Sequence, residues 1–268
     1  IIETGHLSKL EEYQTNDEVK KMDMFTKIWG AGPAQAKKWI DQGYQTLDDL
    51  RAKAHLTHNQ QVGLKYYDEF LQRIPRAEIQ EIEHVVRETA ELLRPGIILT
   101  TGGSYRRGQQ TCGDCDMIIT HPDGKSHENL LIPLVESLKK KAQQQSYITD
   151  DLVYTDRTDA EGTHIKYYGV FILPGEGRVH RRLDIIIVPY SEHGCALIYF
   201  TGSTLFNRSM RRLADDMNMH LSGHRLQAGV IRKGKKLVNE GVTLPTPTEE
   251  SVFKYLNLPY RPPTERDH

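Results

Sequence analysis

Three aspartates on or beside strongly apolar segments constrain the fold of this chain more than any other feature of its sequence. Asp114 and Asp116 lie two residues apart in front of Met-Ile-Ile, and Asp184 is followed by Ile-Ile-Ile. Because side chains alternate along a strand, Asp114 and Asp116 share one face of it. A carboxylate on a buried strand is costly unless it is paired or binds a cation. The pattern therefore predicts a sheet with a site for hard divalent cations, and the third acid makes the site suitable for two of them.

A glycine-rich turn precedes the aspartate pair. Residues 102–108 read Gly-Gly-Ser-Tyr-Arg-Arg-Gly and follow an apolar run at 97–101. Adjacent glycines after a strand let backbone N–H groups converge on an anion, and a short helix that begins there adds partial positive charge. Each feature has an ordinary explanation when it is taken singly. An Asp-x-Asp pair is most often a turn, Asp184 could simply form an ion pair with Arg182, and adjacent glycines occur in many turns. The three features together predict a site for a triphosphate and its metal ions.

The apolar pattern changes near Gly96. Before it, apolar residues recur at helical spacing, and a Gly-Ala-Gly-Pro turn at 30–33 separates two of the segments. After it, short β-branched runs bounded by turns are typical of strands, with helices between and beyond them. We expect helices at 47–50, 60–71, 78–93, 130–141 and 207–217, strands at 97–101, 117–120, 169–173 and 183–188, and an extended tail from 245 with a short helix near 251–256.

Composition excludes some classes of protein and leaves others open. The 268 residues carry a net charge of −1, and no apolar run is long enough to span a bilayer, so we expect a soluble intracellular protein without a membrane partner. At 201–240, eight Lys/Arg residues stand against three acids, which indicates either a solvated helix face or a phosphate-binding face. Cys112 and Cys115 lack the second pair that a zinc site needs, so reduced thiols are expected.

These motifs resemble those of the family X DNA polymerases. The resemblance rests on the glycine-rich turn, on Gly-Asp-Cys-Asp at 113–116, on Arg-Arg-Leu-Asp at 181–184 and on Tyr-Phe-Thr-Gly-Ser at 199–203, and it extends over essentially the whole chain. It implies an α+β fold: a nucleotidyltransferase palm with a mixed sheet, preceded by an all-helical DNA-binding subdomain and followed by a small α+β nucleotide-binding subdomain. The expected parts are the remnant of a lyase domain at 1–14, the helical part with a helix-hairpin-helix at 15–72, the palm at 73–190 and the nucleotide- and template-binding part at 191–268.

The resemblance also implies a reaction, in which a primer 3′-hydroxyl attacks the α-phosphorus of a dNTP and pyrophosphate leaves. By this likeness Asp114 and Asp116 bind two Mg²⁺ ions, for which Mn²⁺ can substitute. Asp184 binds the catalytic ion and helps the hydroxyl to lose its proton. Paired metal ions stabilise both the attacking and the leaving oxygen in such a transfer.

The implied biological role is template-directed filling of short gaps in the nucleus, during base-excision repair and non-homologous end joining. The DNA partner is then a primer-template or a gapped duplex. The protein is expected to be a monomer whose repair-protein partners bind through upstream regions.

Substrate contacts are implied residue by residue. The nucleotide contacts are expected at Arg73, Gly103, Ser104, Arg107, Gly113, Tyr199, Phe200, Gly202 and Asn207. The DNA contacts are expected at Gly30, Gly32, Lys166, Arg182, Arg208, Arg211 and His224. The backbone of Thr26, Ile28 and Ala31 is expected to bind Na⁺ or K⁺ in the helix-hairpin-helix, which holds a DNA phosphate without reading base sequence.

Three features depart from the family pattern. Gly223 stands where an acid is expected before His224, and the segment 232–241 differs in length and charge. The remnant at 1–14 lacks the lysine nucleophile of a lyase domain, so we expect no lyase activity. None of these departures affects the three aspartates.

Three other interpretations remain open. A template-independent terminal transferase would share the chemistry, but such relatives tend to carry Gly-Trp where this chain has Tyr199 and Phe200, together with a longer loop between strands. An Asp-x-Asp glycosyltransferase would need neither Asp184 nor the arginine-bearing turn. A non-catalytic module that binds DNA ends could keep the same fold.

Overall fold

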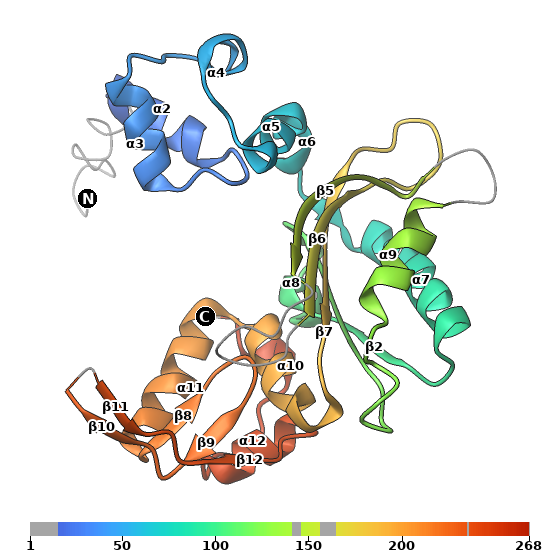
Figure 1. Ribbon diagram of the computed structural model, residues 1–268, viewed down its shortest axis with the longest axis vertical. Coiled ribbons are helices and arrows are strands. Elements are labelled where there is room, and N and C mark those ends of the chain that lie inside the picture. Colours follow the sequence, from blue (N-terminus) through green and yellow to red (C-terminus); the bar gives the residue numbers. More distant parts are fainter. Residues whose placement is uncertain (1–15, 141–145, 156–164, 235, 268) are drawn as a thin grey trace, which may run out of the picture. The chain divides into compact units, whose positions relative to one another are not determined.

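The computed structural model describes residues 16–140, 146–155, 165–234 and 236–267 (Figure 1). The chain divides into two compact units, the first ending at Gln72 and the second beginning at Arg73. The expected remnant of a lyase domain at 1–14 lies outside the described residues. Each unit has its own hydrophobic core.

The first unit consists of short helices around a small apolar core. They are α2 (Asp17–Thr26), α3 (Pro33–Asp41), α4 (Leu47–Lys53), α5 (His58–Lys65) and α6 (Tyr67–Phe70). Thr46 and Thr57 each form a capping box, which satisfies backbone N–H groups at the starts of α4 and α5. Phe25 and Trp39 meet edge to face in the core, with ring centroids 5.9 Å apart. The single helix expected at 60–71 is wrong, because Tyr66, with φ −104° and ψ 20°, separates α5 from α6.

Replacing Gly63 with alanine should destabilise the first unit, although alanine ordinarily favours a helix. A Cβ built at Gly63 would lie 2.5 Å from the carbonyl oxygen and 2.8 Å from the amide nitrogen of Trp29. Backbone atoms cannot turn aside as a flexible side chain can, so the clash should outweigh the gain of about 1 kcal/mol in helix propensity. We expect a net loss of about 1–3 kcal/mol in the free energy of unfolding, measured by urea denaturation.

Gly32→Ala is the matched control for Gly63→Ala, because no atom lies within 4 Å of a Cβ built at Gly32 and its φ is −83°. The control should change the free energy of unfolding by less than the Gly63 variant does. Equal stability of the two variants would contradict the proposed clash.

The second unit is built on a mixed five-stranded sheet. In spatial order its strands are β2 (Ile98–Thr101), β4 (Cys115–Thr120), β7 (Arg181–Ile187), β6 (Ile165–Phe171) and β5 (Ile148–Thr155). β4 and β7 run parallel, and the other neighbours are antiparallel. Together with the helices, this sheet confirms the predicted α+β class. The sequence pattern does not predict β5, because Asp150 and Asp151 interrupt its apolar residues and its register with β6 shifts next to both.

The two faces of this sheet are covered differently. Helices α7 (Arg76–Leu93) and α9 (Leu131–Lys139) lie side by side against one face, over residues such as Met117, Ile119 and Ile185 (Figure 1). On the other face, Ile118 and Ile186 pack against α10 (His193–Thr201). Asp116 and Asp184 share this second face because side chains alternate along each strand. The acids therefore lie on the face away from α7 and α9.

The remainder of the second unit is a smaller α+β layer. Its elements are α10, α11 (Thr204–Asp216), α12 (Glu249–Tyr255), the three-stranded sheet β12 (Val242–Leu244), β9 (Leu226–Ala228) and β8 (Met219–Leu221), and the pair β10 (Ile231–Lys233) and β11 (Lys236–Asn239). Its core joins α10, α11 and α12 through Ile198, Phe206, Met210 and Phe253. The short helix expected near 251–256 corresponds to α12.

Short elements complete the second unit. They are α8 (Gly103–Arg106), the strand pair β1 (Ile74–Pro75) and β3 (Thr111–Cys112), and the 3₁₀ turns η1 (Tyr190–Glu192) and η2 (Pro263–Glu265). Across the described part of the chain, no helix combines the length and the apolar character that a membrane span requires.

Candidate active site

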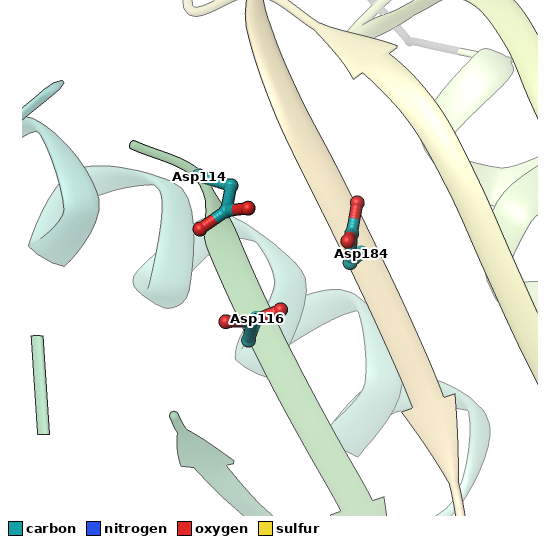
Figure 2. Close-up of side chains that lie close together, drawn as sticks. All are labelled: Asp114, Asp116 and Asp184. Carbon is teal, nitrogen blue, oxygen red and sulfur yellow. The ribbon is translucent and has the colours of Figure 1, made fainter. Parts of the chain in front are cut away.

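Three carboxylates, those of Asp114, Asp116 and Asp184, come together on β4 and β7 (Figure 2). Asp116 and Asp184 are register partners in the parallel pair of strands, and Asp114 immediately precedes β4. Each residue offers one carboxylate oxygen, and these three oxygens all lie within 4.8 Å of one another. Alternation along β4 places Asp114 and Asp116 together, and the pairing of β4 with β7 adds Asp184.

Burial and like charge make three bare carboxylates unfavourable at this place. Burial raises the pKa of Asp116, and the neighbouring Asp184 raises it further. Burial also raises the pKa of Asp184, while Arg182 acts in the opposite direction. The Arg182 guanidinium donates hydrogen bonds to Asp114 and, over 3.3 Å, to Asp184 Oδ2. One guanidinium therefore offsets only part of the negative charge of the three acids.

A divalent cation fits this group of acids. Asp184 is only 8% exposed, and its Oδ1 is buried without a hydrogen-bond partner among the described residues. Carboxylate oxygens are the ligands that hard divalent cations prefer, and a bound cation would neutralise the charges that raise these pKa values. The three aspartates could therefore hold a metal ion.

The glycine-rich turn lies directly against these acids. Gly103, the first residue of α8, has φ +56°, and a Cβ built there would lie 2.7 Å from Asp116 Oδ2. The Gly102 N–H donates to the backbone oxygen of Asp116 over 2.8 Å. Ser104 is the next residue of α8. Glycine suits position 103, because its φ lies in the left-handed region and a Cβ there would require the Asp116 carboxylate or the turn to shift.

Two arginines predicted to bind phosphate, Arg107 and Arg73, contact different parts of the site. Arg107 Nη1 donates to the Thr201 carbonyl over 2.6 Å, and its Nε donates to Asp267 Oδ1 over 3.0 Å. Arg107 therefore joins α8 to α10 and to a residue near the C-terminus. Arg73 lies next to Gly113, since its Nη1 is 3.9 Å from a Cβ built on that glycine.

A pocket of about 390 Å³ opens beside α8, α10 and the start of α11. This volume falls within the range of small-molecule sites. Among the residues predicted to bind the nucleotide, those that line the pocket are Gly103, Arg107, Tyr199, Phe200, Gly202 and Asn207. Arg73, Ser104 and Gly113 lie outside its lining. The structure thus brings most, but not all, of the predicted nucleotide contacts to one cavity.

Tyr199 forms one wall of this pocket and is 41% exposed. Its backbone oxygen accepts a hydrogen bond from Asn207 Nδ2 over 2.8 Å, and the Arg211 guanidinium lies 5.1 Å from its ring centroid. A Cβ built at Gly223 would lie 2.9 Å from the Tyr199 ring. Glycine at 223 therefore lets this ring lie against the backbone.

The predicted DNA contacts of the second unit occupy several elements. Lys166 lies on β6, Arg182 lies on β7 beside the acids, and Arg208 and Arg211 are exposed on α11. His224, by contrast, is only 6% exposed. The exposed cations are available to a DNA strand, whereas His224 is largely covered by protein.

The residues predicted to bind a monovalent cation lie in the first unit, at the end of α2 and in its connection to α3. The Ala31 N–H donates to the Ile28 carbonyl over 3.0 Å, and the Thr26 hydroxyl donates to the Met22 carbonyl over 2.8 Å. Gly30 has φ +85°, which makes the sharp turn possible. Gly32 caps the N-terminus of α3.

Two features near the site have no counterpart among the predicted site residues. Tyr168 on β6 is the register partner of Asp184, and continuing the alternation from Lys166 along the strand would have found it. Glu249 is 3% exposed and binds two arginines, Arg106 and Arg266. The sequence around Glu249 does not predict these ion pairs, because its partners are 143 and 17 residues away.

Comparisons with protein families match three consecutive parts of the chain. Residues 23–71 match the fingers domain of DNA polymerase lambda, residues 73–190 match the DNA polymerase beta palm, and residues 196–267 match the DNA polymerase beta thumb. The palm match contains all three aspartates.

Comparisons with individual proteins agree with these matches. The whole chain is 52% identical to DNA polymerase lambda of Rattus norvegicus, covering 45% of that protein, and 38% identical to DNA polymerase lambda of Arabidopsis thaliana, covering 50%. It is 28% identical to DNA nucleotidylexotransferase of Homo sapiens, covering 55%. The chain thus spans about half the length of these relatives. With fingers, palm and thumb matched in turn and this identity along its whole length, the chain belongs to the family X DNA polymerases.

Proposed function

We propose that this chain carries out template-directed DNA synthesis, adding a dNTP to a primer 3′-hydroxyl with release of pyrophosphate, to fill short gaps during DNA repair. The observation that supports this best is the position of Gly103, which lies against Asp116 and also lines the 390 Å³ pocket. A metal-binding group of acids and a cavity with a phosphate-binding arginine, Arg107, are therefore adjacent. That adjacency is what transfer of a nucleotidyl group requires.

The proposed chemistry divides the acids by role. Asp114 and Asp116 would hold two Mg²⁺ ions, or Mn²⁺ in their place, and Asp184 would hold one of them. When bound, such ions neutralise the leaving pyrophosphate and lower the pKa of the attacking hydroxyl. Asp184 Oδ1, buried and without a hydrogen-bond partner among the described residues, is available to the primer hydroxyl or to an ion.

The nucleotide would lie in the pocket of α8, α10 and α11. Arg107 and the backbone of the turn at 102–104 would bind the β and γ phosphates, since a guanidinium fork and backbone N–H groups suit phosphate oxygens. Ser104, Arg73 and Gly113 would complete this contact from outside the pocket. Tyr199 and Phe200, whose ring centroids are 4.9 Å apart, would crowd the 2′ position and favour deoxyribose.

Each unit would contribute its own contacts to DNA. The connection between α2 and α3 would bind a phosphate through Na⁺ or K⁺ and the carbonyls of Thr26, Ile28 and Ala31. The exposed Arg208 and Arg211 would face the template, and Lys166 and Arg182 the primer. We further propose that the protein acts as a monomer in the nucleus, with repair-protein partners bound through upstream regions.

The most direct test is extension of a labelled primer on a duplex with a one-nucleotide gap. In Mg²⁺, the base added should follow the template base in all four template contexts, and a chelator should abolish extension until Mg²⁺ is restored. Loss of activity is expected because uncompensated carboxylates would repel the triphosphate.

A single-stranded primer in the same assay separates the alternatives. Efficient untemplated addition to it would favour a terminal transferase, the activity that the name of the human relative describes. Retained DNA binding with no extension on either substrate would favour a non-catalytic DNA-end-binding module. Either result would overturn the proposed function.

A further inference from the structure

Tyr168 continues the row of acids across the sheet. The strand order is β2, β4, β7, β6, so β6 follows β7 on the side away from β4. Asp116 is the register partner of Asp184, and Asp184 is the register partner of Tyr168. Directly opposed residues on neighbouring strands point to the same face of a sheet. The side chains of Asp116, Asp184 and Tyr168 therefore form one row on the face away from α7 and α9.

The surroundings of Tyr168 agree with this position. Its neighbour Tyr167 is fully buried in the core on the opposite face, whereas Tyr168 is only partly buried. Burial, together with the charges of Asp184, Asp116 and Tyr199, raises the pKa of Tyr168 to about 12. Tyr168 thus lies beside the acids and is not fully covered by protein.

The direction of the reaction assigns this side of the acids to the primer. The turn proposed to bind the β and γ phosphates directly follows β2, which is at the edge of the sheet beyond β4. In phosphoryl transfer the attacking and leaving oxygens are roughly in line. With the leaving pyrophosphate on the β2 side of Asp116, the primer hydroxyl must approach from the β6 side of Asp184. Tyr168 and Lys166, two residues apart on β6, share that side and that face.

We infer that the ring of Tyr168 is the surface against which the sugar of the primer-terminal nucleotide packs, so that Tyr168 positions the attacking hydroxyl beside Asp184. This inference rests on the proposed polymerase function. A flat, rigid side chain restricts the positions that a sugar can take. It does so without occupying the carboxylates that are needed for chemistry. Lys166 supplies a cation to the phosphate on the same side, and Tyr168 supplies the apolar surface.

Single-turnover extension of a gapped duplex separates this role from nucleotide binding. Tyr168→Ala should lower the maximal rate by about tenfold or more, because small misplacements of reacting groups are costly. The dNTP concentration that gives half of the maximal rate should stay within about twofold, since the pocket is not lined by Tyr168. Tyr168→Phe should recover most of the lost rate, because the inference needs the ring and not the hydroxyl.

Tyr154→Ala is the matched control. Tyr154 is a 40% exposed tyrosine on β5 of the same sheet, and its ring contacts Tyr167 of the core instead of the acids. This variant should extend primers at the wild-type rate. Thermal unfolding of each variant shows whether a lost rate reflects lost structure. If Tyr168→Ala does not fold, Tyr168→Leu replaces it, with the same expected loss relative to Tyr168→Phe.

Each outcome has a separate meaning. A wild-type maximal rate for folded Tyr168→Ala or Tyr168→Leu, beside an active wild-type protein, would overturn the inference alone. So would a loss confined to dNTP affinity, or a rate for Tyr168→Phe as low as for alanine. An inactive wild-type protein would instead overturn the proposed function.

Discussion

Asp184→Ala is expected to abolish primer extension while nearly preserving nucleotide binding. Asp184 contributes one of three carboxylate oxygens within 4.8 Å, and its Oδ1 has no hydrogen-bond partner among the described residues. Removing it takes away a metal ligand and a group available to the attacking hydroxyl. Both effects act on the transition state, so the maximal rate should fall by about a thousandfold or more.

Nucleotide binding should depend much less on Asp184, because the pocket is lined by Gly103, Arg107 and Tyr199 on other elements. Binding can be measured by titrating dNTP into a complex with a dideoxy-terminated primer, in which no reaction occurs. The dissociation constant should change by less than about tenfold, corresponding to less than about 1.4 kcal/mol. A parallel loss of rate and of binding would place Asp184 in nucleotide binding instead of in catalysis.

Asp150→Ala is a suitable control for Asp184→Ala. Asp150 lies on β5 of the same sheet, outside the group of three acids. Its variant should extend primers at the wild-type rate. Wild-type-like extension by Asp184→Ala would remove the assigned role, whatever the result of the control.

Local spacing predicts only part of this site. That Asp114 and Asp116 share a face follows from the two-residue repeat of a strand, a property of five or six consecutive residues. That Asp184 joins them depends on parallel pairing of β4 with β7, which are separated by 60 residues. Spacing within one strand does not join Asp184 to the pair. The need of a two-metal site for a third acid predicts that Asp184 joins them, and the resemblance to the polymerase family implied the same.

Helix α10 shows why the periodicity of apolar residues does not predict every element. Residues 193–198 are all buried, so the helix has no polar face that would repeat every 3.6 residues. Its Tyr199 and Phe200 could equally end a buried strand when judged by pattern alone. The short strands β8, β9 and β12 are not predicted for another reason: three residues are too few to show an alternation of apolar and polar side chains.

Glu249 provides the prediction with the largest effect on stability. Its carboxylate accepts hydrogen bonds from Arg106 Nη2 over 2.8 Å and from Arg266 Nη1 over 2.6 Å, and it joins α8 to α12 and to the C-terminal segment. Arg266 is fully buried and Glu249 is 3% exposed. Glu249→Ala would therefore leave a buried guanidinium without its counter-charge. The expected loss is about 3–5 kcal/mol in the free energy of unfolding.

The pH dependence of this effect has a definite sign. Burial alone would raise the pKa of Glu249, but hydrogen bonds from Arg106 and Arg266 outweigh it and lower the pKa below the usual 4.5. A carboxyl with a lowered pKa in the folded state stabilises the fold fully above its unfolded pKa and loses this contribution as the pH falls through its folded pKa. The stability difference between the wild type and Glu249→Gln should thus be constant above about pH 5.5 and shrink at pH values below 4.5.

Urea denaturation of the wild type, Glu249→Ala, Glu249→Gln and Glu250→Ala at pH 7 and near pH 4 tests both expectations. Glu250 is the adjacent residue of α12 and is exposed, so its variant should unfold like the wild type at both pH values. Glutamine keeps the shape of glutamate and can still accept hydrogen bonds, so Glu249→Gln should lose less stability than Glu249→Ala at pH 7. If Glu249→Ala unfolded like Glu250→Ala, the buried arginine would not need its carboxylate partner. A difference between wild type and Glu249→Gln that grew as the pH fell would contradict a lowered pKa.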